Sequence, residues 1–490
     1  MENWAPPFPA NDTEKYALRQ GTKYNQPLVL RNGITVKGAG TDEAGNKATI
    51  LKLAPWVYQW PHYLSKNNPQ SYHACVFVNQ NHPQRKGNYN QHDKGIVISD
   101  LIVDGNGFDP MNRNMGRQYI QTHNEWQGLG GIDLTRAEDV TLKNLVIRYC
   151  RIDGLALGMQ DDMAGPNEDF HGRGWVKDIK VENVVFAENG EWGTGITGSV
   201  LTGMSGWGAR FLNCTWRDGN GGCDIEAGKP IPNYEIDVVF DGCKFLRHVS
   251  WGFEYGSKRQ PTGRIKRLDF VTCTFSKNKP HLLFYGDPDG LNARFDGYQG
   301  KGVRFIGCWF LDGTAQVMAC EAGLGEFSNC LFSGNGTGLV GLFNGQGSDF
   351  NLFGFDSPTS VLAWTFTGCV FAPPPRKVQL PDPMFAAKGD NVMALIAFGL
   401  KDKAGTFVAK QGGSVNLKVQ KCQVVKSMVV DKGGNPASGV FIRTFVNTGR
   451  PSNDPKDPQR NFGNTNDFEW VLNDVQRLVF PWREWTKFKP

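Results

Sequence analysis

FLNCTW (Phe211–Trp216) is the first of six closely similar segments that decide the fold of this chain. The other five are FDGCKF, FVTCTF, FIGCWF, FSNCLF and FTGCVF, which begin at Phe240, Phe270, Phe305, Phe327 and Phe366. Each segment places a cysteine between two aromatic residues, directly after a small or polar residue. Looser copies with an aliphatic residue in place of the cysteine precede them, at ISDLIV (Ile98–Val103), LKNLVI (Leu142–Ile147) and VENVVF (Val181–Phe186). Such a recurrence indicates a stacked repeat architecture.

A second series of short apolar segments alternates with the first, and Asn, Asp and Gly turn signals separate the two. Its members include CDIEAG (Cys223–Gly228), WGFEYG (Trp251–Gly256) and HLLFYG (His281–Gly286). No segment between them has the length and period of a helix. Strands joined only by turns become parallel neighbours when the chain coils and each strand pairs with its counterpart one turn later. The sequence therefore predicts an all-β fold: a right-handed, single-stranded parallel β-helix of about ten to twelve coils with long corner loops.

The charge and hydropathy patterns exclude several functional classes. A net charge of +5 over 490 residues, without a lysine or arginine run, is not typical of a nucleic-acid-binding protein. No apolar run approaches the roughly 18 residues of a membrane span. The opening MENWAPPFPANDTEKY has neither the basic nor the apolar region of a signal peptide. We therefore expect no nucleic-acid partner, no membrane and no visible signal peptide.

The chain has eleven cysteines, most of them at the same position of successive repeats. We expect them inside the stack as small, reduced, apolar residues, as in a protein folded in a reducing cytosol. No C-x-x-C pair is present, and the histidines lack the spacing of metal ligands. We therefore predict no metal site and no cofactor.

The segment PLVLRNGITVKGAG (Pro27–Gly40), followed by ATILKLAP (Ala48–Pro55), resembles the opening coil of the pectate-lyase-like β-helix superfamily. That superfamily includes polysaccharide lyases, glycoside hydrolases of the polygalacturonase type, epimerases and phage tailspikes. The resemblance covers about residues 27–445 and implies a fold rather than one activity, because these enzymes share a scaffold and not a motif. The similarity to tailspikes also implies a homotrimer assembled along the helix axis.

We divide the chain into three parts. Residues 1–26 are predicted to be an N-terminal extension or cap, and residues 27–445 the β-helix, with a proline-rich excursion at about 372–390. Residues 446–490 are predicted to be a C-terminal tail whose aromatic residues cap the last coil.

Three acids of the second series, Asp224, Glu226 and Glu254, are predicted to be catalytic. We align Ile225, Phe253 and Leu283 as inward-facing. The expected outward column is then Ala156, Thr197, Glu226, Glu254, Phe284 and Met318. Neighbouring coils are about 4.8 Å apart, so Glu226 and Glu254 are expected roughly 5 Å apart, with Asp224 on the same face.

Stacked carboxylates are electrostatically unfavourable in a structural role but suit glycoside hydrolysis, which uses a carboxylic acid and a carboxylate. A separation of about 5 Å suits retention of configuration, and a wider pair such as Asp224 and Glu254 suits inversion. The arrangement is similar to that of tailspike endoglycosidases, which carry acids on adjacent coils of one face. In the alternative interpretation the acids form a solvated face neutralised by Lys229, Lys258 or Arg259.

Aromatic residues flank the three acids, and we predict them to be sugar-stacking platforms. These residues are Trp251, Tyr255, Phe284 and Tyr285.

A second group of polar residues lies in GMQDDMAGPNEDFHGRGW (Gly158–Trp175). We predict that Asp161, Asp162, His171 and Arg173 bind substrate at the edge of the same face. The Asp-Asp pair is similar to that of polygalacturonases, but the Gly-His-Gly motif of that family is missing. If the chain is a lyase, the resemblance implies that this loop binds calcium. A polar loop without a special role is the alternative.

These observations favour a phage tailspike-type depolymerase that hydrolyses a bacterial surface polysaccharide, located on a virion or outside the cell. A calcium-assisted polysaccharide lyase or an epimerase of the same fold is the second hypothesis. A non-enzymatic glycan-binding adhesin or structural spike is the third.

Overall fold

The computed structural model describes residues 28–53, 75–81, 91–107, 130–150, 153–158, 174–190, 192–226, 235–257, 264–278, 281–286, 303–313, 317–320, 323–333, 340–341, 361–372, 396–399, 414–424, 440–445, 468–472 and 478–481. All the regular structure in these ranges is strand or bridge. The chain forms two compact units, residues 1–224 and 225–490, and their boundary lies within strand β17 (Gly221–Glu226). We describe each unit separately.

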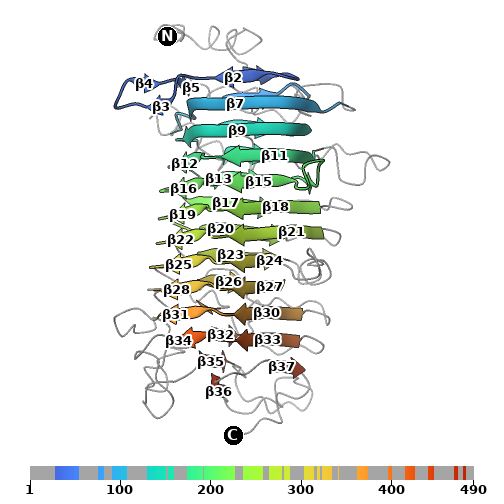
Figure 1. The fold of residues 1–490 in the computed structure, drawn as a ribbon, viewed down its shortest axis with the longest axis vertical. Helices are drawn as coiled ribbons and strands as arrows, with labels where there is room; N and C mark the ends of the chain where they lie inside the picture. Colours follow the sequence, from blue (N-terminus) through green and yellow to red (C-terminus); the bar gives the residue numbers. More distant parts are fainter. Residues whose placement is uncertain are drawn as a thin grey trace, which may run out of the picture. The chain divides into compact units, whose positions relative to one another are not determined.

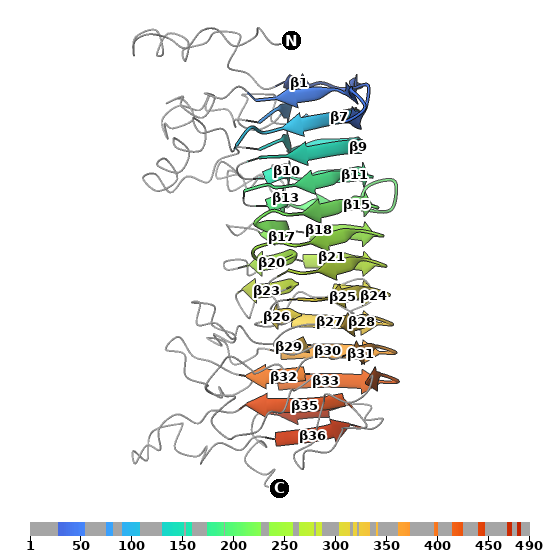
Figure 2. The same ribbon diagram turned by 90° about the vertical axis from the view of Figure 1, so that its left-hand side faces the viewer.

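In the first unit three parallel sheets run side by side (Figures 1 and 2). The first sheet contains β1 (Leu28–Leu30), β6 (Phe77–Asn79), β8 (Ile132–Leu134), β10 (Asp153–Leu157), β13 (Trp192–Ile196) and β17. The second sheet contains β2 (Thr35–Lys37), β7 (Asp93–Asp104), β9 (Ala137–Arg148), β11 (Val176–Glu182), β14 (Val200–Leu201) and β15 (Ala209–Leu212). The third sheet contains β5 (Ile50–Lys52), β12 (Val185–Ala187), β16 (Thr215–Arg217) and the ends of β7 and β9. A short hairpin, β3 (Thr41–Asp42) and β4 (Lys47–Ala48), extends from the first coil.

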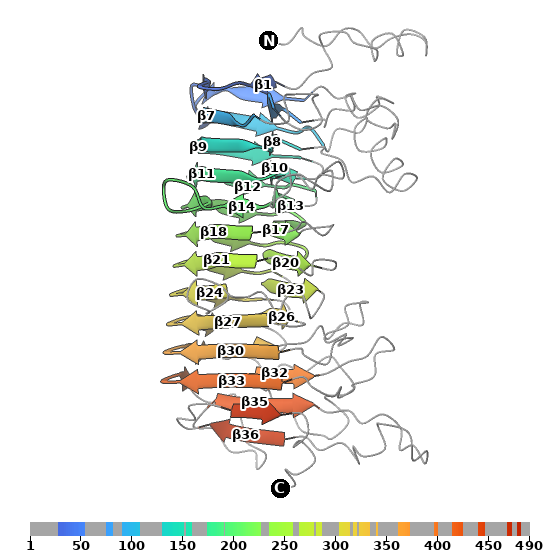
Figure 3. The same cartoon turned by 90° about the vertical axis from the view of Figure 1, so that its right-hand side faces the viewer.

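The second unit repeats the three sheets (Figure 3). The first sheet contains β20 (Phe253–Ser257), β23 (Leu282–Gly286) and β26 (Met318–Cys320). The second contains β18 (Glu235–Asp241), β21 (Arg264–Val271), β24 (Val303–Ile306), β27 (Gly323–Ser328), β30 (Val361–Thr367) and β33 (Ser414–Gln420). The third contains β19 (Lys244–Leu246), β22 (Thr274–Ser276), β25 (Trp309–Leu311), β28 (Leu331–Ser333), β31 (Val370–Ala372) and β34 (Gln423–Val424).

Five further strands belong to the last part of the second unit. Strands β29 (Val340–Gly341), β32 (Ile396–Gly399) and β35 (Val440–Phe445) pair in parallel. Strand β36 (Phe468–Leu472) runs antiparallel to β35, and β37 (Leu478–Pro481) runs antiparallel to β33. The C-terminal segment therefore pairs with strands of the last coils.

Within each unit the second-sheet strands in front of Figure 1 run towards the left while the chain descends, which is a right-handed coil. The predicted right-handed parallel β-helix is confirmed. The predicted division of the chain into three parts stays a prediction, and residues 1–26 lie outside the described residues.

The repeated motif builds the core of the second unit. Its first aromatic residues form one stack, in which Phe240, Phe270, Phe305, Phe327 and Phe366 follow each other at centroid distances of 4.7–5.0 Å. Its second aromatic residues form another stack, in which Phe245, Phe275, Phe310 and Phe332 are 4.6–5.0 Å apart. The cysteine lies between them and donates its S–H to a carbonyl of the preceding coil, as from Cys308 to Phe270 at 3.2 Å. The expectation of buried, reduced cysteines is confirmed for nine of the ten that are described, and the tenth, Cys422, is reduced but only partly buried.

The residue before each cysteine turns the chain from the second sheet into the third. In the described copies it has a positive φ, between 51° and 64°, and the same is true of the looser copies at Asp100, Asn144 and Asn183. Glycine and asparagine tolerate this conformation best, which explains the small or polar residue at this position. The asparagines of the first unit also bond along the stack, since Asn183 Nδ2 donates to Asn144 Oδ1 and Asn144 Nδ2 to Asp100 Oδ1.

Ion pairs between coils cover the outward face of the second sheet. Arg267 Nε lies 2.6 Å from Asp237 Oδ1, and Arg304 Nε lies 2.7 Å from Asp269 Oδ1. These acids therefore have partners on the neighbouring strand and serve the fold.

No helix among the described residues is long and apolar enough to cross a membrane.

Candidate functional site

A column of glycines fixes the register of the first sheet in the first unit. A Cβ atom at Gly131 would lie 2.5 Å from the carbonyl oxygen of Gly154. The corresponding distances are 2.6 Å from Gly154 to the oxygen of Gly193 and 2.9 Å from Gly193 to that of Gly222. Successive coils therefore approach too closely here for any side chain.

The residues that follow these glycines alternate between the core and the outward face. Ile132, Leu155 and Thr194 are opposite one another and fully buried. The next position holds Asp133, Ala156 and Gly195, so this is the outward column. The strand pairing that places Gly193 beside Gly222 brings Asp224 into the same column, next to Gly195.

Asp153 fills the gap that Gly195 leaves in this column. A Cβ atom at Gly195 would lie 2.5 Å from Asp153 Oδ2 and 3.3 Å from Asp153 Oδ1, so the carboxylate occupies the space of the missing side chain. Asp224 is one strand further on and only 4% exposed. Because neighbouring strands are about 4.8 Å apart, we expect the two carboxylates to be separated by roughly one strand spacing. We call Asp153 and Asp224 the carboxyl pair.

A third acid, Asp133, belongs to the same column two coils before Gly195. It is 6% exposed, and Thr135 Oγ1 lies 3.5 Å from its Oδ1. The backbone N–H of Thr135 donates to Asn79 Oδ1, whose Nδ2 donates to Asp93 Oδ2 at 2.7 Å. Buried hydrogen bonds thus fix the end of β8, which carries Asp133.

In the second unit, Glu254 occupies the outward position of β20 and is 3% exposed. The indole Nε1 of Trp251 donates a hydrogen bond to Glu254 Oε2. The Trp251 ring also packs against Leu283, which is opposite Glu254 on β23. The Glu254 carboxylate therefore lies beside an aromatic and an aliphatic side chain. Such a combination of a polar group with apolar surfaces suits the binding of a sugar.

The structure corrects the register expected for the second series. Glu254 pairs with Leu283, not with Phe284, so Leu283 faces outward. Phe284 pairs with Tyr255, and Met318 pairs with Leu282, so these side chains belong to the inward columns. In the first unit the residue opposite Ala156 is Gly195, not Thr197. The error arose because the apolar residues of HLLFYG are consecutive, and only the preceding position, opposite Gly252, fixes the alignment.

Two of the four predicted sugar platforms are core residues. Phe284 is fully buried, with its ring centroid 6.0 Å from that of Phe253, and Tyr255 is 5% exposed. Trp251 is on the outward side, beside Glu254. The side chains of Glu226 and Tyr285 lie outside the described residues, as do Asp161, Asp162, His171 and Arg173.

Asp133 and Asp153 were missed by the sequence reasoning, although a signal was present. The segments GIDL (Gly131–Leu134), GLAL (Gly154–Leu157) and GCDI (Gly222–Ile225) align on their glycine, which identifies Asp133 and Asp224 as equivalent. Glu254 has the same place in its own unit, two residues after Gly252. Asp153 carries no such signal, because its position depends on the missing side chain of Gly195.

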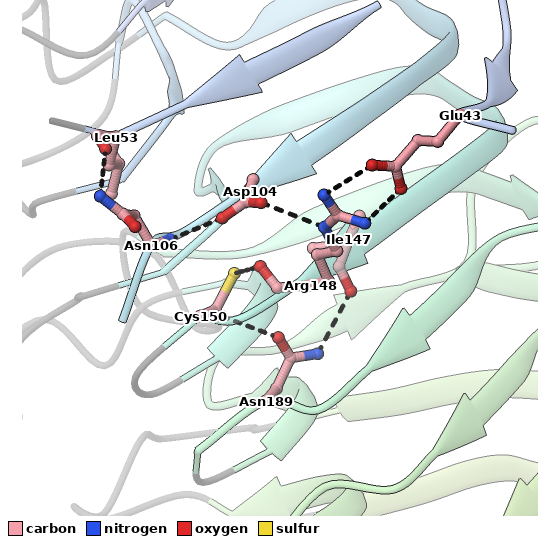
Figure 4. Close-up of polar contacts among 8 residues, drawn as sticks. All are labelled: Glu43, Leu53, Asp104, Asn106, Ile147, Arg148, Cys150 and Asn189. Carbon is pink, nitrogen blue, oxygen red and sulfur yellow. Dashed lines mark hydrogen bonds and ion pairs between the residues drawn. The ribbon is translucent and has the colours of Figure 1, made fainter. Parts of the chain in front are cut away.

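Two acids of the first coils, Glu43 and Asp104, have structural partners (Figure 4). Arg148 Nε lies 3.0 Å from Asp104 Oδ2, and the same guanidinium pairs with Glu43 of the β3–β4 hairpin. Asp104 Oδ1 accepts the backbone N–H of Asn106, whose side chain donates to the carbonyl of Leu53. These contacts tie the first coils together, so we assign this group to the fold.

Metal binding finds no support in this part of the chain. Among the residues that the structure describes, no three or more His, Cys, Asp or Glu side chains are arranged to hold a metal ion. The calcium implied for a lyase concerns the segment 159–173, outside the described residues. We therefore derive no step that requires a metal.

No protein-family model matches the chain, and no curated protein matches it. Among solved structures it is similar to ORF18 of Geobacillus virus E2, with 13% identity, a TM-score of 0.36 and coverage of 82% of this chain. The chain spans about half, 52%, of that protein. It is also similar to the A-module of mannuronan C-5 epimerase AlgE4 from Azotobacter vinelandii, with 12% identity, a TM-score of 0.37 and coverage of 84% of this chain and 86% of the module. A third similar structure is the N-terminal fragment of gene product 12 of bacteriophage Phi29, with 12% identity, a TM-score of 0.39 and coverage of 84% and 66%.

Proposed function

We propose that this chain is a carbohydrate-active β-helix protein that hydrolyses a bacterial surface polysaccharide, in the manner of a phage tailspike depolymerase. The observation that carries the proposal is the carboxyl pair, since Asp153 fills the space left by Gly195 beside Asp224. Two neighbouring carboxylates repel each other when both are charged, and this is unfavourable unless the pair has a use. Glycoside hydrolysis needs such a pair, one group to donate a proton to the leaving oxygen and one to attack the sugar.

The spacing of the pair favours retention of configuration. Retaining enzymes hold the two carboxyl groups about 5 Å apart, so that one attacks the anomeric carbon directly, whereas inverting enzymes leave room for a water molecule. We infer that the carboxyl pair is separated by roughly one strand spacing, about 4.8 Å, because Asp153 occupies the side-chain space of Gly195 on the neighbouring strand. We therefore propose a covalent glycosyl intermediate on one carboxylate of the pair. NMR of the first product formed, before mutarotation, tests this, and a product of inverted configuration would contradict it.

Substitution of the pair tests the function itself. We expect Asp153→Asn and Asp224→Asn each to lower the release of reducing ends at least about 100-fold while leaving glycan binding intact, because the fold and binding surface remain. Glu182→Gln is the matched control, since Glu182 pairs with Lys180 on β11 of the same unit. Unchanged hydrolysis in both Asn variants would show that the pair is not catalytic.

The acids predicted in the second unit remain part of the proposal. Glu226 and Glu254 are expected to contribute to hydrolysis within the second unit, with Trp251 beside Glu254 as a sugar platform. If Glu226 and Glu254 act in one step, the double variant Glu226→Gln/Glu254→Gln is expected to be about as active as the less active of the two single variants. Multiplied losses would indicate separate contributions. Wild-type activity of both Glu226→Gln and Glu254→Gln would remove these residues from the mechanism.

Product analysis separates the three hypotheses that the sequence left open. A hydrolase releases reducing ends, a lyase releases unsaturated ends that absorb in the near ultraviolet, and an adhesin binds glycan without releasing either. We expect reducing ends without ultraviolet absorbance, and no effect of a calcium chelator. Unsaturated ends that disappear on chelation would instead support the calcium-assisted lyase.

We further propose that the protein acts as a homotrimer on a virion or outside the cell. The free, buried cysteines support folding in a reducing compartment before release. Light scattering on the purified chain is expected to give three times its 54.3 kDa mass. A monomeric mass would contradict the trimer but leave the catalytic proposal unaffected.

A further inference from the structure

Two tryptophans have the same place in the first sheet of their respective units, directly before the glycine at the start of the strand. The segments are WGTG, which begins at Trp192, and WGFE, which begins at Trp251. In the second segment, Trp251 donates a hydrogen bond to the carboxylate of Glu254, three residues later. In the first segment the corresponding residue is Gly195, which has no side chain. The strand that carries Trp192 therefore provides no carboxylate of its own.

Asp153 supplies the carboxylate that this strand lacks. It is opposite Trp192 on the preceding coil, and its carboxylate occupies the space that a side chain at Gly195 would fill. Each unit thus places a tryptophan and a carboxylate as neighbours on the outward face of its first sheet. The carboxylate comes from the same strand in one unit and from the preceding coil in the other, so the same combination is built in two ways.

The ring of Trp192 lies over the following coil. A Cβ atom at Gly221 would lie 2.0 Å from Cζ3 and 2.1 Å from Cε3 of Trp192, so the six-membered part of the indole occupies the space of the missing side chain. Gly221 precedes Asp224 by three residues on β17. The indole therefore lies beside the carboxyl pair, with Asp153 opposite Trp192 on the coil before and Asp224 on the strand that the ring covers.

Trp192 differs from the aromatic residues of the core. It is partly exposed, whereas Phe186 and Trp216 of the same unit are at most 1% exposed. An indole supported by a glycine backbone, with carboxylates next to it, matches the two kinds of surface of a sugar. The C–H groups of a pyranose ring pack against an aromatic ring, and its hydroxyl groups donate hydrogen bonds to carboxylates.

We propose that Trp192 binds a pyranose ring of the glycan, and that Gly221 is required because it seats the indole. The sugar best suited is a hexopyranose with equatorial hydroxyl groups, since its ring faces then carry C–H groups alone. Held on Trp192, this sugar lies next to Asp153 and Asp224, where its glycosidic bond is cleaved. Cleavage at this position rests on the proposed function, whereas binding of a pyranose by Trp192 does not.

NMR of the full-length protein labelled with 5-fluorotryptophan tests the inference without any assay of hydrolysis. The probes are methyl β-D-glucopyranoside and methyl β-D-galactopyranoside, with glycerol as a control that has hydroxyl groups but no ring. The variants Trp192→Phe, Trp251→Phe and Trp309→Phe assign the three fluorine signals. We expect the Trp192 signal to shift and saturate with a glycoside but not with glycerol. The signal of Trp309, which is 54% exposed on the third sheet, is expected to stay constant.

The variant Gly221→Ala tests the seating of the indole. Its Cβ displaces the ring but leaves Trp192 in the chain, so the dissociation constant read from the Trp192 signal is expected to rise about tenfold. The Trp251 signal in the same spectra reports on the second unit, and its titration is expected to be unchanged. Trp192→Ala is a second variant that alters no backbone contact. It is expected to weaken saturation transfer from the protein to the glycoside, whereas Trp309→Ala is not.

Three outcomes overturn the inference. They are a Trp192 signal that neither glycoside moves even at molar concentration, an equal response of the Trp192 and Trp309 signals, and a dissociation constant that Gly221→Ala leaves unchanged.

The two proposals fail separately. If Asp153→Asn and Asp224→Asn abolish hydrolysis but no glycoside moves the Trp192 signal, the assignment of Trp192 is wrong and the function stands. If a glycoside binds at Trp192 but both Asn variants retain hydrolysis, the sugar site stands without the proposed carboxyl pair.

Discussion

At the scale of the residue, each position of the FxxCxF motif has its own physical reason. The two aromatic residues build separate stacks with centroids about one strand spacing apart. The cysteine is small enough for the space between the stacks and offers a donor to a backbone carbonyl of the coil before it, which alanine or valine lacks. The residue before it has a positive φ, which favours Gly and Asn.

The first prediction concerns this turn position. Thr272 is β-branched and has a φ of 51°, a conformation that its side chain disfavours. We expect Thr272→Gly to raise the free energy of unfolding by up to about 1 kcal/mol and Gly307→Ala to lower it by about 1 kcal/mol. A Cβ at Gly307 would meet only Thr272 Cγ2 at 3.7 Å, whereas one at Gly368 would collide with Asn329 Oδ1. Gly368→Ala should therefore be more destabilising than Gly307→Ala.

Urea unfolding of the three variants, compared with the wild type, measures these differences. Equal effects of the two Gly→Ala changes would show that the collision relaxes easily. A lower unfolding midpoint for Thr272→Gly would contradict the assignment of strain at this position.

The second prediction concerns the cysteine column. Cys308 is fully buried, and its thiol donates to Phe270 O at 3.2 Å. We expect Cys308→Ala to lower the free energy of unfolding by about 1–2 kcal/mol, from the cavity and the lost hydrogen bond. Ser333→Ala, on the outward side of β28, is the control and should change it by less than about 0.5 kcal/mol. Similar losses in both variants would mean that the column is not specifically packed.

At the scale of the element, the turns between sheets carry information that the strands do not. Phe, Val, Ile and Leu fill both inward and outward positions of several strands, so apolar character alone does not fix the register. The glycine column does, because the carbonyl of the next coil approaches within 2.5–2.9 Å of a Cβ at these positions. The residues at the turn from the first sheet to the second also help to fix the register. His92, Arg136 and Trp175 lie at this turn in three successive coils.

The third prediction is the pH dependence of stability at that turn. The pKa of His92 is about 4 in the folded protein and ordinarily 6.5, so between these values the unfolded chain binds more protons than the folded one. The stabilisation by neutral His92 is therefore complete above about pH 6.5 and is lost progressively as the pH falls towards 4; because the side chain is partly exposed, solvent screening keeps this loss well below the full value of the pKa shift. We expect His92→Gln to have a flatter stability curve over this range in urea titrations at several pH values.

Trp175→Leu serves as the companion variant. It removes the ring that covers His92, so the pKa of His92 should return towards 6.5 and the pH dependence should shrink in the same direction. A wild-type curve that is flat between pH 4 and 6.5 would contradict the burial of this histidine.

At the scale of the whole molecule, the fold could be predicted from the sequence because the same physical demand recurs in every coil. Six copies of one motif made the inward stacks and the turn positions visible, and the aromatic and cysteine residues are where the motif implied. The candidate site has no such repetition. Asp224 and Glu254 could be found as polar residues in apolar strands, but Asp153 reaches the column only because residue 195 lacks a side chain. The register predicted for β23 was wrong because Leu282, Leu283 and Phe284 are all apolar, so the sequence did not show which of them faces outward.

The last prediction follows from the arrangement of coils within each unit. Each coil contacts the coil before it and the coil after it, so the effect of a core cavity should remain close to the altered coil. Leu142 of β9 is opposite Ile98 on β7 and Val181 on β11, and Phe270 of β21 is opposite Phe240 and Phe305. We expect Leu142→Ala to accelerate amide exchange in β7, β9 and β11, and Phe270→Ala to do so in β18, β21 and β24. The local destabilisation should be about 3–4 kcal/mol in each case, as for large-to-small changes in a packed core. Hydrogen exchange with mass spectrometry measures both variants against the wild type, and each serves as the control for the other. If either variant accelerates exchange equally in β7 and in β24, then the protein unfolds as one cooperative structure and the coil-by-coil description of its stability is wrong.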